Sequence, residues 1–275
     1  MTERISIWLI ILAVFVLPSC EKVIDYDLQS ADPVIVIEAT VTSNNEPFNV
    51  LISKTTPYFG ASESSLVQGA KVSIKTENGK PRYFNEISPG VYQLNKFIAP
   101  PKNWYIINIE NEGITYTAKS YLNNFVPIVD CNITYFEGLG FFDSGYKINC
   151  FIKDPPDVDN YYRLKLYKNG KTVNTKGEMD IYTDRLFDGK TIGLMQNSSV
   201  VFDITDTVIV ELQSIDKAAY DYFSTLEGIT GLEFVQSASP SNPISNFNNG
   251  ALGYFSAYSY DRKTVIISNY TPSGH

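Results

Sequence analysis

Short segments in which apolar and polar residues alternate follow one another from Pro33 onward. Alternation places successive side chains on opposite faces of the backbone, which is typical of half-buried strands. The pair Asn78-Gly79 separates two of these segments and favours a tight hairpin, because both residues tolerate positive φ. The pattern predicts strands over residues 34–42, 48–54, 70–75, 82–87, 90–94, 104–110 and 115–121. So many short strands predict a small β-sandwich over residues 33–122, immunoglobulin-like or transthyretin-like in size.

The strand pattern continues over residues 123–270, interrupted by one helical segment. Strands are predicted over 161–168, 176–183, 199–202 and 207–215, with a closing hairpin over 251–260 and 263–267. Asp216 is a typical N-cap for a helix over 217–227, and Gly228 is expected to end it. The apolar stripe of this helix is expected to pack on a sheet and consists of Ala219, Tyr222, Phe223 and Leu226. The predicted fold class is therefore mainly β, with the N-terminal β-sandwich followed by a second β-rich domain that carries one short helix.

The first twenty residues have the pattern of an export signal. An apolar run over residues 5–17 is too short to span a bilayer comfortably, and it leads into Leu17-Pro18-Ser19-Cys20. This ending resembles the lipobox of bacterial lipoproteins, which implies cleavage before Cys20 and acylation of that residue, for example with palmitate. The prediction is a signal peptide over 1–19, lipidation at Cys20 and an acidic tether over 20–32. A transmembrane anchor, or an ordinary secretory peptide with an incidental cysteine, stays open as the alternative.

Composition supports the β-rich class and excludes several functions. The chain has 19 Tyr and 16 Phe but only 3 Met, which is the bias of pleated, half-buried surfaces. A formal net charge of -8 without any basic cluster argues against nucleic acid as a partner. The single histidine, His275, lies in a tail over 271–275 that is expected to be disordered, so no imidazole is available for a catalytic triad. No Gly-rich phosphate-binding motif is present, and no cofactor is predicted.

Two cysteines remain once Cys20 is assigned to lipid. Cys131 and Cys150 are symmetric about a glycine-bearing turn near Gly140, so a hairpin would place them opposite one another. In an oxidising envelope this arrangement predicts a cross-strand disulfide. Two buried thiols that pack as small apolar groups are the alternative.

Two further groups of residues are candidates for ligand binding. Asp154, Asp157 and Asp159 form the densest acidic loop and could offer oxygen ligands to Ca²⁺, although a turn stabilised by its own Asp and Asn side chains is the better explanation. No other metal site is predicted. The aromatic residues Trp104, Tyr254, Tyr258 and Tyr260 could face a sugar, although core packing is the better explanation for most of them. The three tyrosines share one parity and should lie on one face of a strand.

Several motifs together resemble a family of bacterial lipoproteins. They are Thr55–Phe59, Gly69–Ile74, Pro89–Tyr92, Asn160–Arg163, Ala219–Tyr222, Asn242–Asn246 and Gly250–Phe255. The chain resembles the domain of unknown function 4249 family along its whole length. That resemblance implies a lipoprotein of the Gram-negative envelope, often encoded beside TonB-dependent outer-membrane receptors. It supplies no catalytic residues.

These observations predict a lipid-anchored protein of the bacterial envelope, at the outer membrane, that is not an enzyme. It would act as a binding or accessory component of a TonB-dependent transport system, with the membrane and a TonB-dependent outer-membrane receptor as expected partners. A stand-alone carbohydrate- or peptide-binding lipoprotein is the alternative. A hydrolase using paired carboxylates such as Asp180 and Asp184 is the third hypothesis.

Overall fold

The computed structural model describes residues 32–56, 65–138, 143–173, 179–196, 199–230 and 242–267, and those from Pro33 on belong to one compact unit. The predicted signal peptide, Cys20, the tether except Asp32, and the tail over 271–275 lie outside the described residues. Among the described residues, no helix has the length and apolar character that crossing a membrane requires.

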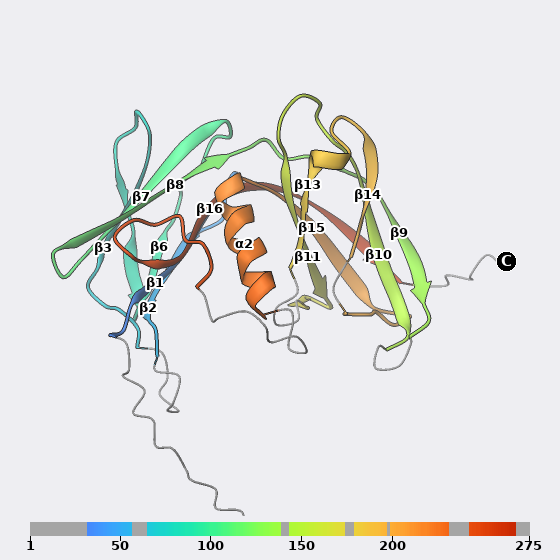
Figure 1. The fold of residues 1–275 in the computed structure, drawn as a ribbon, viewed down its shortest axis with the longest axis horizontal. Coiled ribbons are helices and arrows are strands. Elements are labelled where there is room, and N and C mark those ends of the chain that lie inside the picture. The colour runs from blue at the N-terminus through green and yellow to red at the C-terminus, as the bar shows by residue number, and fades with distance from the viewer. Residues whose placement is uncertain are drawn as a thin grey trace, which may run out of the picture. The chain divides into compact units, whose positions relative to one another are not determined.

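One large sheet of nine strands forms the main layer of this unit (Figure 1). Its strands are β1 (Ile35–Thr42), β2 (Phe48–Lys54), β5 (Asn85–Ser88), β6 (Val91–Leu94), β11 (Tyr161–Lys168), β12 (Lys171–Thr172), β13 (Asp180–Thr183), β15 (Thr207–Ile215) and β16 (Leu252–Ile266). The hydrogen-bonded order is β12-β11-β15-β16-β1-β2-β6-β5, with β13 also paired to β11. The sheet therefore joins strands from both halves of the sequence.

Two smaller sheets complete the layers. The first has the order β4-β3-β7-β8 and is made of β3 (Lys71–Thr76), β4 (Arg82–Tyr83), β7 (Asn103–Asn111) and β8 (Ile114–Leu122). The second has the order β14-β10-β9 and is made of β9 (Ile128–Phe136), β10 (Gly145–Lys153) and β14 (Thr191–Met195). Each small sheet packs on part of the large sheet, because alternate residues of both layers are buried together.

Two hydrophobic cores lie between these layers. The first contains Ile37 and Val50 from the large sheet with Ile107 from the small one, and it also contains Phe255. The second contains Leu164 of β11 with residues of β10 and β15. The chain is thus a mainly β protein built from packed sheets, as the alternation of apolar residues predicts.

Strand β16 connects the two cores. Its first half, Leu252–Tyr258, pairs in parallel with β1, and its second half, from Ser259 on, pairs antiparallel with β15. Gly253 makes this parallel pairing possible: its φ is +93°, and a Cβ there would lie 2.0 Å from the carbonyl oxygen of Ile37. Only glycine allows both that conformation and that approach.

The face of the large sheet that points away from both cores carries the helix α2 (Lys217–Thr230) and is called here the α2 face. Ala219, Tyr222 and Phe223 of the helix form a small cluster with Ile215, so the predicted apolar stripe is core. The carboxylate of Asp216 caps the helix by accepting the Ala219 N–H at 3.0 Å, as predicted.

Three expectations are corrected. The helix continues through Gly228 to Thr230. Residues 251–267 do not fold back as a hairpin. Asp261 and Arg262 pair with β15, and their side chains are bonded to neighbouring segments, so β16 continues through them as one strand. The predicted strand over 199–202 is reduced to a single bridge between Phe202 and Tyr146, while β14 is a strand that the pattern did not predict.

Candidate functional site

A small recess opens on the α2 face where the helix meets the large sheet. Its volume is about 50 Å³. It is lined by residues of β1, β11, β15, β16 and α2: Thr40, Arg163, Lys165, Gln213, Phe223, Tyr254, Ser256 and Tyr258. The alternation of side chains along a strand explains why Arg163 and Lys165 face the recess. They occupy the positions of β11 between Tyr162, Leu164 and Leu166, whose side chains point into the second core.

Two cationic side chains converge on the recess. The guanidinium carbon of Arg163 lies 4.0 Å from the centre of the Phe223 ring, which is a cation–π contact. Burial lowers the pKa of Lys165, and the nearby positive charge of Arg163 lowers it further. Within the described part of the chain, neither cation forms an ion pair with a carboxylate.

A buried carboxylate close to these cations, that of Glu211, already has hydrogen-bond partners. Glu211 of β15 receives Arg262 Nη2 at 2.7 Å, the hydroxyl of Tyr167 at 3.3 Å and Gln213 Nε2 at 2.6 Å. Arg262 neutralises its charge, so the recess keeps the positive charges of Arg163 and Lys165.

Two polar atoms in the recess have no hydrogen-bond partner among the described residues. They are Nε of Arg163 and Oγ of Ser256, and both are buried. Buried polar atoms normally form hydrogen bonds, so two such atoms without a partner in the same recess are unusual.

Two of the predicted aromatics line this recess, and two do not. Tyr254 and Tyr258 point from β16 into it, and burial raises the pKa of both. Tyr260 lies on the same face, but its hydroxyl donates to Glu46 Oε1 at 2.7 Å. Trp104 lies elsewhere, on β7, where its ring centre is 5.3 Å from that of Tyr121. Arg163 and Lys165 were not predicted as site residues.

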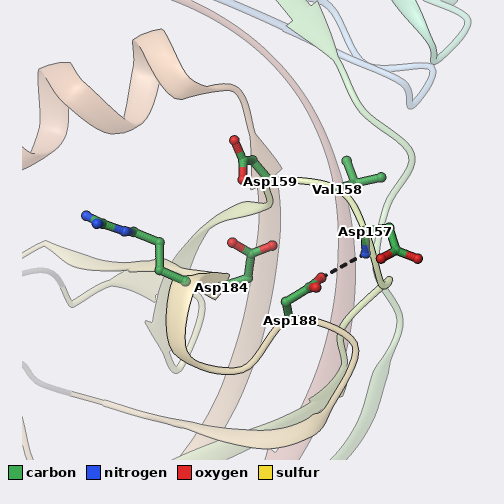
Figure 2. Close-up of a pocket in the computed structure, with 6 residues that line it drawn as sticks. Asp157, Val158, Asp159, Asp184 and Asp188 are labelled. Atoms are coloured by element: carbon green, nitrogen blue, oxygen red, sulfur yellow. Dashed lines mark hydrogen bonds between the residues drawn. The ribbon is translucent and has the colours of Figure 1, made fainter.

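The acidic loop forms a second candidate, a pocket of about 580 Å³ (Figure 2). Asp157 and Asp159 line it with Asp184 and Asp188, which come from the turn after β13. The carboxylates whose oxygens lie within 4.8 Å of one another are Asp154, Asp184 and Asp188, a different set from the one predicted. Pairing of β11 with β13 brings these distant residues together.

Hydrogen bonds within the loop account for most of this acidic cluster. Asp154 accepts the Tyr162 hydroxyl at 2.5 Å and the Gly189 N–H at 2.9 Å, while burial raises its pKa. Asp184 accepts the Asn160 N–H at 2.7 Å. Asp188 accepts the Asp157 N–H at 3.0 Å, the bond drawn as a dashed line in Figure 2. These oxygens suit a cation such as Ca²⁺ in chemistry, but their bonds also explain the loop as a self-stabilised turn.

Cys131 and Cys150 lie directly opposite one another on β9 and β10, as the symmetric spacing predicts. Both are free thiols in the structure, Cys150 buried and Cys131 partly buried. The register is thus confirmed, and the disulfide stays a prediction.

The fold and these sites define a mainly β protein of packed sheets with a polar recess on one outer face. The chain belongs to the family described as domain of unknown function (DUF4249), whose model matches residues 21–264. None of the curated proteins matches it.

Two solved structures of β-rich chains show a distant likeness. One is a segment of two fibronectin type-III domains from chicken tenascin, with 13% identity, a TM-score of 0.22, and coverage of 66% of this chain and 91% of that one. The other comprises the FN1–FN3 domains of chicken CNTN1, with 11% identity, a TM-score of 0.23, and coverage of 67% and 63%. Nothing about function follows from either.

Proposed function

We propose that this protein is a non-catalytic binding protein of the bacterial envelope. It is held at the outer membrane by lipid on Cys20 and acts as an accessory of a TonB-dependent transport system. The observation that supports a binding role is the recess on the α2 face, where Arg163 and Lys165 lack carboxylate partners among the described residues. Cations that are held unpaired in a partly buried place suit recognition of an anionic group.

The envelope placement is supported by the sequence. The apolar run before Cys20 has the length of a signal peptide, and the family resemblance adds the association with TonB-dependent receptors. Two or more acyl chains anchor a protein stably, since each buried CH₂ contributes about 0.8 kcal/mol.

A detergent pull-down of the full-length protein from its own membranes tests the proposal. Mass spectrometry is expected to find an acylated Cys20 at the amino terminus and a receptor barrel that copurifies. The Cys20→Ser variant is the matched control, because it should lose the lipid and the membrane association but keep the fold. An unmodified Cys20 with the leader still attached would refute the anchoring, and the repeated absence of a barrel would refute the accessory role.

A stand-alone carbohydrate- or peptide-binding lipoprotein is the second candidate. A cavity of about 490 Å³, lined by Asn44, Asn124, Phe125 and Ser259 among others, favours it, because neutral amides and hydroxyls beside an exposed ring suit a sugar. Retention on a glycan array, without any barrel partner in the pull-down, would select this candidate.

A further inference from the structure

We propose that the recess on the α2 face binds the carboxylate group of a ligand whose remaining part lies outside it. This inference rests on the binding function proposed above and adds the chemical class of the ligand. Two sources would supply the same group: the carboxyl terminus of a peptide, or an acidic sugar.

The charge of the recess selects an anion. Arg163 and Lys165 both line it, and Glu211, the buried acid nearby, is bonded to Arg262. Glu38 lies opposite Tyr254 in the strand register, but it is exposed and forms no ion pair with either cation in the described structure. A bound carboxylate would compensate two partly buried positive charges that have no carboxylate partner among the described residues.

The unpaired atoms identify where such a ligand would bond. Within the described ranges, the buried Nε of Arg163 has no acceptor for its N–H, and the hydroxyl of Ser256, which is 1% exposed, has no partner. A carboxylate oxygen accepts from both kinds of donor, so one group would satisfy two atoms that have no partner in the described part of the chain.

The size of the recess limits what enters it. Its volume of about 50 Å³ compares with ~30 Å³ for one water molecule in the liquid and ~300–1,000 Å³ for a site that encloses a whole small molecule. The space therefore suits one terminal group. The rest of the ligand must lie over the rim.

The donors of Arg163 suit a carboxylate. Its guanidinium carbon lies 4.0 Å from the centre of the Phe223 ring and its Nη2 donates to Met179 Sδ at 3.6 Å, while its Nε has no partner among the described residues. An arginine edge offers parallel N–H donors that match the two oxygens of a carboxylate. A phosphate matches the same donors in charge, but its four oxygens make it bulkier than a carboxylate for a recess of about 50 Å³.

Nuclear magnetic resonance of the full-length protein in detergent tests this inference through the ¹⁵Nε signal of Arg163. The probes are acetate, N-acetylglycine against N-acetylglycine amide, glucuronate against glucose, and inorganic phosphate. We expect a saturable shift with the carboxylates and none with the amide or glucose. The binding constant should weaken about tenfold or more in Lys165→Gln, read on the same signal.

Arg185→Gln is the matched control, since it removes one exposed positive charge outside the recess. Ser256→Ala is a second variant that keeps the charge and should still weaken binding. Tighter binding of N-acetylglycine than of glucuronate identifies a peptide terminus as the source, and the reverse order identifies an acidic sugar.

The inference is overturned if no carboxylate gives a saturable shift, if phosphate binds more tightly than every carboxylate, or if Arg185→Gln weakens binding as much as Lys165→Gln. Its failure differs from failure of the proposed function. If a receptor copurifies with the protein but no carboxylate binds, the accessory role is supported and the carboxylate site is refuted. If carboxylates bind but no receptor copurifies, the carboxylate site is supported and the accessory role is refuted.

Discussion

Glu211 decides the charge balance of the α2 face. It is 1% exposed, and its carboxylate accepts from Arg262, Tyr167 and Gln213 at once. A buried charge is tolerated when it is paired and fully hydrogen-bonded. Because Arg262 provides that pairing, Arg163 and Lys165 stay available on the same face.

Among the described glycines, Gly253 is the one at which substitution by alanine should destabilise the fold most. Gly253→Ala would place Cβ 2.0 Å from the Ile37 carbonyl oxygen at a φ of +93°, so β1 and β16 must move apart. We expect a loss of roughly 2–4 kcal/mol in the free energy of unfolding, measured by urea denaturation. Gly250→Ala is the control, since Gly250 also has positive φ, +74°, but has open space around it. Equal losses in both variants would contradict the close-approach argument.

Asp154 should give the stability a measurable pH dependence. Burial raises the pKa of Asp154 above its ordinary value of 3.8, so the folded protein holds this proton more tightly than the unfolded chain. Its contribution is therefore fully present below pH 3.8 and is lost as the pH rises through the folded pKa. As the pH rises from 3.8 through the folded pKa of Asp154, the free energy of unfolding should fall less in the Asp154→Asn variant than in the wild type. Asp157→Asn, an exposed neighbour, should keep the wild-type slope, and a steeper slope in Asp154→Asn would refute the assignment.

At the scale of elements, the alternation of apolar and polar residues predicted where most strands lie, but it did not predict which strands pair with one another. The hairpin of β9 and β10 follows from a symmetric spacing around one turn, which a sequence displays directly. The parallel pairing of β1 with β16 joins residues more than two hundred positions apart, and no local signal encodes it. The recess depends on that pairing. The alternation of residues along β16 therefore predicted that Tyr254 and Tyr258 lie on one face of the strand. It did not predict that Arg163 would line the same recess. Alternation along β11 does place the side chains of Arg163 and Lys165 on the face of the sheet that points away from the core.

Asp216 links α2 to the first small sheet as well as capping the helix. One carboxylate oxygen accepts the Ala219 N–H and the other accepts the Tyr121 N–H of β8, each at 3.0 Å. Asp216→Ala should cost about 2–4 kcal/mol, since it removes a cap and leaves a partly buried amide unpaired. Thermal unfolding followed by circular dichroism measures the loss. Asp221→Ala, which removes only an exposed pair with Lys217, should change the midpoint much less, and a similar change would refute the linking role.

The β9–β10 hairpin should respond to oxidation. Cys131 and Cys150 are register partners, so mild oxidation should join them and stabilise the fold by about 3 kcal/mol, the value expected for a short closed loop. The measurement is the unfolding midpoint with and without reductant, together with intact mass. Cys131→Ala should show no reductant-dependent difference. Two titratable thiols after oxidation, detected under denaturing conditions, would refute the disulfide.

At the scale of the whole compact unit, β16 makes the two cores depend on each other. The strand contributes Phe255 and Ala257 to the first core, and its second half pairs with β15 at the edge of the second. Asn123 Nδ2 also donates to the Ile215 carbonyl oxygen at 3.1 Å, across the sequence position where the predicted domains meet. Division into separate domains at residue 122 stays a prediction, and these shared contacts favour cooperative unfolding.

Urea unfolding with one probe for each core tests this cooperativity. Trp104 fluorescence reports on the first small sheet, because the other tryptophan, Trp8, lies in the signal peptide that is proposed to be cleaved. Reactivity of the buried thiol Cys150, with Cys131→Ala as background, reports on the second core. Because unfolding of either core must detach part of β16, both probes should give the same midpoint. Phe255→Ala, a truncation in the first core, should lower the thiol midpoint as much as the fluorescence midpoint. Exposure of Cys150 at a urea concentration where Trp104 is still native would mean that the cores unfold separately, and that β16 joins them in structure without coupling their stability.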